Sequence, residues 1–149
     1  MTLRLAVFIG LGLAAAAPAS AEFACPSKGL THAPATFVTA TGRHKFDLEV
    51  AASAEAQQCG LMYRKTMKPG AGMIFPFTPP RDATFWMENT VLPLDLVFVG
   101  PDSKVLSIAT GKPFSRDMIP SGGITASVIE PNAGQASKIG LKPGDRVEK

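Results

Sequence analysis

The chain has 149 residues, with 15 basic and 12 acidic side chains and a formal net charge of +3 at pH 7. This length suits a single domain, and the basic residues are scattered rather than gathered in a stripe. The charge pattern therefore argues against nucleic acid as a partner. With two histidines and no Cys-x-x-Cys pair, the sequence predicts neither a metal site nor a cofactor.

The first 21 residues resemble a secretory signal peptide. Arg4 precedes an apolar run over residues 5–17, and the small residues Ala19, Ser20 and Ala21 follow. The run is too short to span a membrane, and the pattern predicts cleavage after Ala21. We therefore expect a periplasmic or secreted protein. Its predicted organisation is a signal peptide over 1–21, an N-terminal tail and first strand over 22–43, and a β domain over 44–149.

The chain contains two cysteines, Cys25 and Cys59. In an oxidising compartment such a pair favours a disulfide, which would join the N-terminal tail to the element that carries Cys59. The alternative is two separate thiols, with Cys59 buried as a small apolar residue.

The first predicted elements are a strand and a helix. Phe46, Leu48 and Val50 alternate with charged residues, which is the period of a half-buried strand. Ser53 then suits the N-cap of a helix over residues 54–62. Gly60 within this helix predicts either a packing requirement or an early helix end.

The rest of the chain favours further strands. Residues 73–77 follow a Pro-Gly turn, and Pro76 in this segment favours an edge or a bulge. A loop over 78–81 comes next, then strands over 84–87, 94–99, 104–109 and 125–130, and a short helical turn over 132–138. Several short strands and one clear helix predict a mainly β fold, an antiparallel sandwich or barrel-like single domain with one short helix.

Residues 83–99, ATFWMENTVLPLDLVFV, contain the only tryptophan. The polar cluster Glu88, Asn89 and Thr90 interrupts an apolar run, so it either closes a tight turn or provides groups that are used in binding. Asparagine and threonine suit hydrogen bonds to local backbone in a turn. We expect the cluster to close a sharp connection and to line a shallow pocket beside Trp86.

Four phrases, GLMYRKTM, GAGMIFPF, FWMENTVLPLDLVFV and GLKPGDRV, occur in this order and resemble the family called domain of unknown function 192. The resemblance runs from about Phe46 to Val147. It implies a compact, mainly antiparallel β fold with one helix, and it implies no reaction. Cys59 is not a family hallmark. Glu88 stands where relatives often have lysine, which puts in doubt any model that needs a positive charge beside Asn89.

The polar members of these phrases give the candidate ligand-binding residues, namely Arg64, Trp86, Asn89, Thr90 and Asp95. We expect them to converge on one partly open site, with Arg64 forming a bidentate pair with Asp95. No nucleophile–base motif is present, which favours a non-catalytic module that binds a small molecule or an extracytoplasmic protein on the face around Trp86. The alternative is a hydrolase-type enzyme that uses Asp95 or Glu88 with Arg64, and a purely structural role for the phrase stays open.

Overall fold

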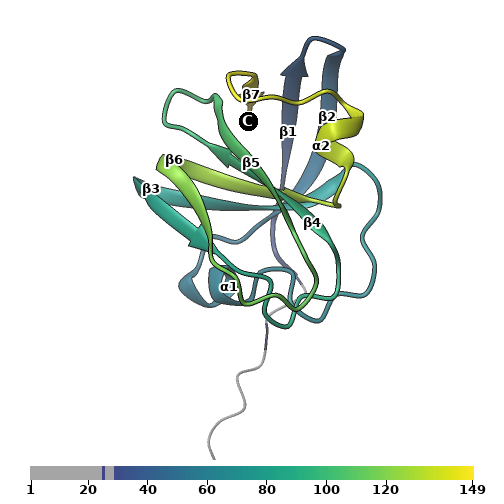
Figure 1. Ribbon diagram of the computed structural model, residues 1–149, viewed down its shortest axis with the longest axis vertical. Helices are drawn as coiled ribbons and strands as arrows, with labels where there is room; N and C mark the ends of the chain where they lie inside the picture. Colours follow the sequence, from purple (N-terminus) through teal and green to yellow (C-terminus); the bar gives the residue numbers. More distant parts are fainter. Residues whose placement is uncertain (1–24, 26–28) are drawn as a thin grey trace, which may run out of the picture.

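The computed structural model describes Cys25 and residues 29–149, so the predicted signal peptide lies outside the described residues. The described part contains seven strands and two short helices (Figure 1). In chain order these are β1 (His32–Thr39), β2 (Gly42–Val50), α1 (Ala54–Cys59), β3 (Ala71–Phe85), β4 (Leu94–Val99), β5 (Val105–Gly111), β6 (Ile119–Pro131), α2 (Gln135–Lys138) and β7 (Arg146–Glu148).

All seven strands form one sheet, in the order β5-β4-β6-β3-β2-β1-β7. Neighbouring strands are antiparallel except β2 and β3, which are parallel because the segment containing α1 crosses over between them. The two ends of this order approach each other, since Lys104 forms a bridge with Arg146 and the Val147 N–H donates to the Ser103 carbonyl at 2.8 Å. The predicted mainly β, barrel-like single domain is confirmed, with one parallel pair that was not expected.

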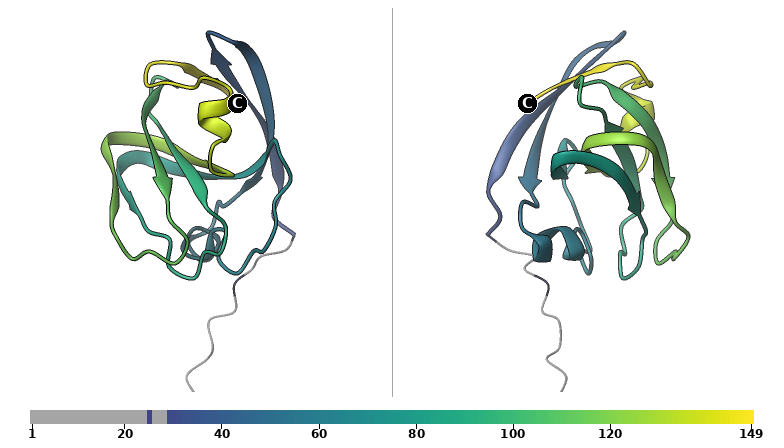
Figure 2. Two further views of the ribbon diagram at one scale, coloured as in Figure 1. Left: turned by 45° about the vertical axis from the view of Figure 1, so that its right-hand side comes forward. Right: turned by 90° about the vertical axis from the view of Figure 1, so that its left-hand side faces the viewer.

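Apolar side chains fill both faces of the central strands. One cluster, the α2-side cluster, includes Phe37, Leu48, Val97, Ile129 and Ile139. The other, the α1-side cluster, includes Ala56, Leu61, Met73, Phe75, Met87, Leu94, Leu96, Phe98 and Val128. The two helices lie at opposite ends of the curved sheet (Figures 1 and 2). Because the two clusters pack on opposite faces of β4, all six of its residues are buried, which explains its nearly continuous apolar sequence.

Helix α1 begins at the predicted cap and ends earlier than predicted. The Ser53 hydroxyl accepts a hydrogen bond from the Ala56 N–H at 3.1 Å, and the helix stops at Cys59. Gly60 follows with a φ of +49°, and a Cβ there would lie 3.3 Å from the Phe75 ring. Both reasons suggested for this glycine, packing and an early helix end, therefore apply.

Strand β3 is a single strand of 15 residues, whereas the sequence predicted two strands and a loop over 78–81. The prediction of a separate loop is wrong because the segments on both sides of it pair with β6, which extends well beyond the predicted 125–130. The register with β6 shifts between Pro76 and Arg81, so the pairing is irregular after Pro76, where the sequence predicted an edge or a bulge.

The structure bonds Cys25 to Cys59, with their Cα atoms 5.3 Å apart, and so contains the predicted bridge. It attaches the residue nearest the N-terminus in the described part to the last residue of α1. Within that same part, every helix is too short or too polar to cross a membrane.

Candidate functional site

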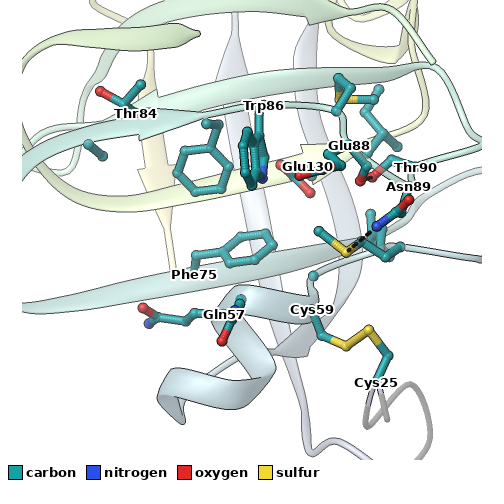
Figure 3. A pocket seen from close by; sticks show the side chains of 18 of the residues that line it. Cys25, Gln57, Cys59, Phe75, Thr84, Trp86, Glu88, Asn89, Thr90 and Glu130 are labelled. Atoms are coloured by element: carbon teal, nitrogen blue, oxygen red, sulfur yellow. Dashed lines mark hydrogen bonds between the residues drawn. A yellow bond between two sulfur atoms is a disulfide. The ribbon is translucent and has the colours of Figure 1, made fainter. Parts of the chain in front are cut away.

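An open pocket of about 960 Å³ lies beside α1 (Figure 3). Helix α1 and the turn after it form one wall, and β3 with the loop over residues 86–90 forms another. The end of β6 contributes Glu130. The pocket thus opens into the α1-side cluster, and three of the phrases that carried the family resemblance meet around it.

The loop that carries the polar cluster is a tight turn. The Thr90 N–H donates to the Met87 carbonyl at 3.1 Å, and the Thr90 hydroxyl donates to the Glu88 carbonyl at 3.1 Å. Asn89 has a φ of +55°, a left-handed conformation that asparagine tolerates better than most residues. The polar groups therefore close the turn, and the same residues also line the pocket.

Two other loops hold this turn in place through backbone hydrogen bonds. The Tyr63 N–H donates to the Asn89 carbonyl at 2.9 Å, and the Met87 N–H donates to the Ser115 carbonyl at 2.9 Å. Met87 itself is buried, whereas Trp86 next to it remains 46% exposed and lines the pocket. A fixed backbone thus presents a large, half-exposed aromatic ring at the pocket.

Glu130 is the unusual polar residue of this site. It lies on the same face of β6 as Val128 and is 4% exposed, and its carboxyl group has no hydrogen bond or ion pair with another described residue. Every fully buried side-chain oxygen in the described part of the chain has a partner, so the Glu130 oxygens must reach the open space of the pocket. Burial raises the pKa of this carboxyl to about 8, because the charged form is poorly solvated there.

Among the described residues of the lining, the other charged groups are Glu88 and Arg81. Glu88 forms an ion pair with Arg116 at 2.5 Å, and the Arg116 side chain is 76% exposed. The guanidinium carbon of Arg81 lies 4.4 Å from the centroid of the Phe77 ring, a cation–π contact. The pocket therefore combines two carboxyl groups, one guanidinium and several aromatic side chains.

The structure does not form the predicted pair between Arg64 and Asp95. Arg64 instead makes a bidentate contact with Glu49, with Nη1–Oε1 at 2.5 Å and Nη2–Oε2 at 2.6 Å. The bidentate geometry was predicted correctly, and the partner was wrong. Glu49 lies on β2, whereas Arg64 lies in the β2–β3 crossover after α1, so only the fold brings the two together. Arg64 is not part of the pocket lining.

Asp95 lies on the other face of β4. It is 3% exposed, its Oδ1 accepts from the Thr110 hydroxyl at 3.0 Å, and its Oδ2 accepts from the Ala136 N–H at 3.0 Å. The neighbours on its own strand, Leu94 and Leu96, point into the α1-side cluster, so Asp95 points away from the pocket toward α2. Its visible role is to bind the first turn of α2.

Of the five candidate ligand-binding residues, the structure thus brings Trp86, Asn89 and Thr90 together at one pocket and places Arg64 and Asp95 elsewhere. Sequence reasoning missed Glu130. The available signal was a lone glutamate within the apolar segment ASVIEP, because a charged residue in a buried strand is rare unless it is used or paired.

The disulfide forms part of the pocket wall, since both Cys25 and Cys59 line it. Cys59 is 2% exposed, so the bridge holds α1 against the α1-side cluster. Among the described residues, no group of three or more histidine, cysteine, aspartate or glutamate side chains could hold a metal ion. The described lining offers groups for hydrogen bonding, charge pairing and aromatic contact.

Comparisons with known proteins agree with the fold. The model of the family domain of unknown function 192, described as "Uncharacterized ACR", matches residues 36–149. A protein of unknown function from Novosphingobium aromaticivorans DSM 12444 is 45% identical, with a TM-score of 0.80 over 91% of this chain and 94% of its own. A protein from Sinorhizobium meliloti 1021, provisionally described as a transcription regulator, is 36% identical, with a TM-score of 0.78 over 82% of this chain and 96% of its own. No curated protein matches.

Proposed function

The chain belongs to the family domain of unknown function 192, and from this premise we propose that it is an exported, non-catalytic module that binds a small ligand in the pocket beside Trp86. One observation carries the proposal: a half-exposed tryptophan and an unpartnered buried carboxyl, Glu130, line the same open pocket. A buried ionisable group without a partner lowers stability, so its presence is easier to explain by use than by folding.

The size and lining of the pocket support this proposal. Ligand sites are typically concave spaces of roughly 300–1,000 Å³ that combine apolar walls with a few polar groups. This pocket of about 960 Å³ lies within that range, and its described lining combines aromatic side chains with the polar groups of Glu130 and of residues 88–90. The proposed export rests on the leader pattern in the sequence, and the Cys25–Cys59 bridge is compatible with an oxidising compartment.

Most of the residues proposed for the alternative, a hydrolase, lie outside the pocket. Asp95 points away from the pocket and is bound to Thr110 and Ala136, while Arg64 is paired with Glu49. Only Glu88 of the proposed catalytic set lines the pocket. The described residues therefore favour binding over catalysis by that set.

A thermal-shift screen of a small-molecule library tests the proposal. Ligands that bind the folded protein raise its melting temperature, and we expect Trp86→Ala to lose the increase. Ile124→Ala is the matched control, because Ile124 is 52% exposed, close to the 46% of Trp86, but does not line the pocket. Ligands whose effect is the same in wild type and Trp86→Ala would contradict a binding site on this face.

A further inference from the structure

We infer that the pocket takes an organic cation, an ammonium or amidinium group on an aromatic or aliphatic body, with the cation against Glu130 and the body against Trp86. This inference rests on the proposed function and adds the class of ligand. Glu130 and Trp86 both line this pocket, and Figure 3 draws both on the side across from α1. The two groups therefore lie where one small molecule can contact both.

The charges around Glu130 leave a position for a cation. Within the described residues, Glu130 has no partner, and Glu88 is the second carboxyl of the lining. The partner of Glu88, Arg116, is largely exposed, and water weakens such pairs, so its charge offsets Glu88 only in part. Among the described residues of the lining, Arg81 is the one basic residue, and it already contacts the Phe77 ring.

Glu49, two strands away from Glu130 in the sheet, is already paired with Arg64. Glu49 on β2 and Glu130 on β6 both lie opposite Met73 of β3, so two strand spacings, about 10 Å, separate their backbones. Glu49 is held in the bidentate contact with Arg64, which is not in the pocket lining. Because the opposite charges of Arg64 and Glu49 are in contact, their net electrostatic effect on the Glu130 carboxyl is small.

The aromatic walls suit the same class of ligand. Trp86 is 46% exposed and Tyr63 is 59% exposed, and both line the pocket. Aromatic faces attract cations, with tryptophan the strongest, and Arg81 over Phe77 shows one such contact within the same lining. Among the described lining residues, an anion would find a single guanidinium and two carboxyls, and the carboxyls would repel it.

Ionisation of Glu130 couples binding to pH. With a pKa raised to about 8, the carboxyl of the empty pocket is mostly protonated at pH 7. A bound cation stabilises the carboxylate, so binding releases a proton and becomes tighter as the pH rises toward 8. A neutral ligand that accepts a hydrogen bond from the protonated carboxyl would show the opposite trend.

Three probes with one shared ring separate these cases, namely 2-phenylethylammonium, 2-phenylethanol and phenylacetate. Trp86 is the only tryptophan, so its fluorescence reports directly on the pocket. At pH 8.5 we expect the ammonium probe to bind at least tenfold more tightly than the alcohol and the anion. Its affinity should fall about tenfold per pH unit below pH 7, and calorimetry at pH 7 should detect release of about one proton.

Glu130→Gln is the decisive variant, because it keeps the shape of the side chain and removes its charge. We expect it to lose both the preference for the ammonium probe and the pH dependence, while Ile124→Ala retains both. Equal binding of the alcohol, or tightest binding of phenylacetate, would overturn the cation assignment and leave the pocket as a binding site. No response to the ammonium probe would also overturn it, and the library screen with Trp86→Ala would then decide the proposed function separately.

Discussion

Glu130 places a carboxyl group among apolar side chains of the α1-side cluster, and this position links stability to pH. An unfolded glutamate ionises near pH 4.3, whereas the pKa of Glu130 in the folded protein is raised to about 8 by burial. Between these values the folded state binds the extra proton. The contribution of the protonated Glu130 to the free energy of unfolding is therefore fully present below about pH 4, and it is lost as the pH rises to about 8.

Glu130→Gln should remove this dependence. Relative to wild type, we expect the variant to gain on the order of a few kcal/mol in free energy of unfolding between pH 4 and pH 9. Urea unfolding of both proteins across this range measures the difference. Parallel stability curves for the two proteins would show that Glu130 ionises normally and is better solvated than its 4% exposure indicates.

Asp95 illustrates a polar residue whose role is structural. Asp95→Ala should lower the free energy of unfolding by about 1–3 kcal/mol, because it leaves the Ala136 N–H and the Thr110 hydroxyl without their acceptor. Asp95→Asn keeps one carbonyl oxygen and should cost less. Urea unfolding measures both losses. Binding of pocket ligands should be unchanged in the folded Asp95→Asn variant, and a loss of binding there would return Asp95 to the site.

The turn over residues 87–90 shows how one element serves both folding and the pocket. Its sharp bend requires the left-handed conformation of Asn89, and its carbonyls anchor the neighbouring loops. The Asn89 side chain has only a long contact, Nδ2 to the Met62 sulfur at 4.0 Å. Its backbone is therefore fully used, whereas its amide has little hydrogen bonding within the protein.

A pair of variants separates these two contributions. Asn89→Ala should cost about 1–2 kcal/mol, because alanine is strained at positive φ, whereas Asn89→Gly should keep nearly wild-type stability. Both should bind pocket ligands more weakly if the amide contacts the ligand. Chemical unfolding and fluorescence titration of the two proteins give the answer. Wild-type binding by Asn89→Gly would make Asn89 a turn residue alone.

Local patterns predicted most elements because their signals lie within a few residues. The alternation around Phe46 and Leu48, the Ser53 cap and the apolar segment of β4 each depend on neighbours in sequence. The continuity of β3 was not predictable in this way. It depends on pairing with β6 some 45 residues later, and prolines in the segment suggested an interruption.

The disulfide connects the N-terminal region to α1 and should be important for stability. The bridge spans a sequence separation of 34 residues, so its closure contributes on the order of 3–4 kcal/mol in the loop-entropy model. Cys25→Ala should lose about this amount, and it is a cleaner change than one at Cys59, which is buried. Urea unfolding of wild type with and without reductant is the comparison. Equal stability in both conditions would contradict the prediction.

Export is the prediction that concerns the whole molecule. We expect the mature protein to begin at Glu22 and to carry the Cys25–Cys59 bridge, as the leader pattern and the paired cysteines indicate. Intact-mass measurement on protein from the envelope fraction, followed by non-reducing peptide mapping, tests both points. A mass that retains residues 5–17, or two alkylatable thiols in freshly isolated protein, would contradict them.

The site as a whole was only half predictable from sequence. Trp86, Asn89 and Thr90 are close in sequence, and their shared turn brings them together. Which face of a central strand Glu130 or Asp95 occupies depends on the side that α1 and α2 cover, and both faces of these strands are buried. Because polar and apolar residues therefore do not alternate clearly, the direction of each side chain became clear only from the folded structure.

Because Cys25 is bonded to the end of α1 and lines the pocket, anything attached through the N-terminal segment joins the domain at the pocket wall. The C-terminus lies at the opposite end of the molecule (Figure 1). Immobilising the domain on a sensor surface through its C-terminal end would leave the pocket facing the solution. Capture through the N-terminal end would turn the pocket toward the surface, so the choice of attachment point decides whether weak ligands are detected.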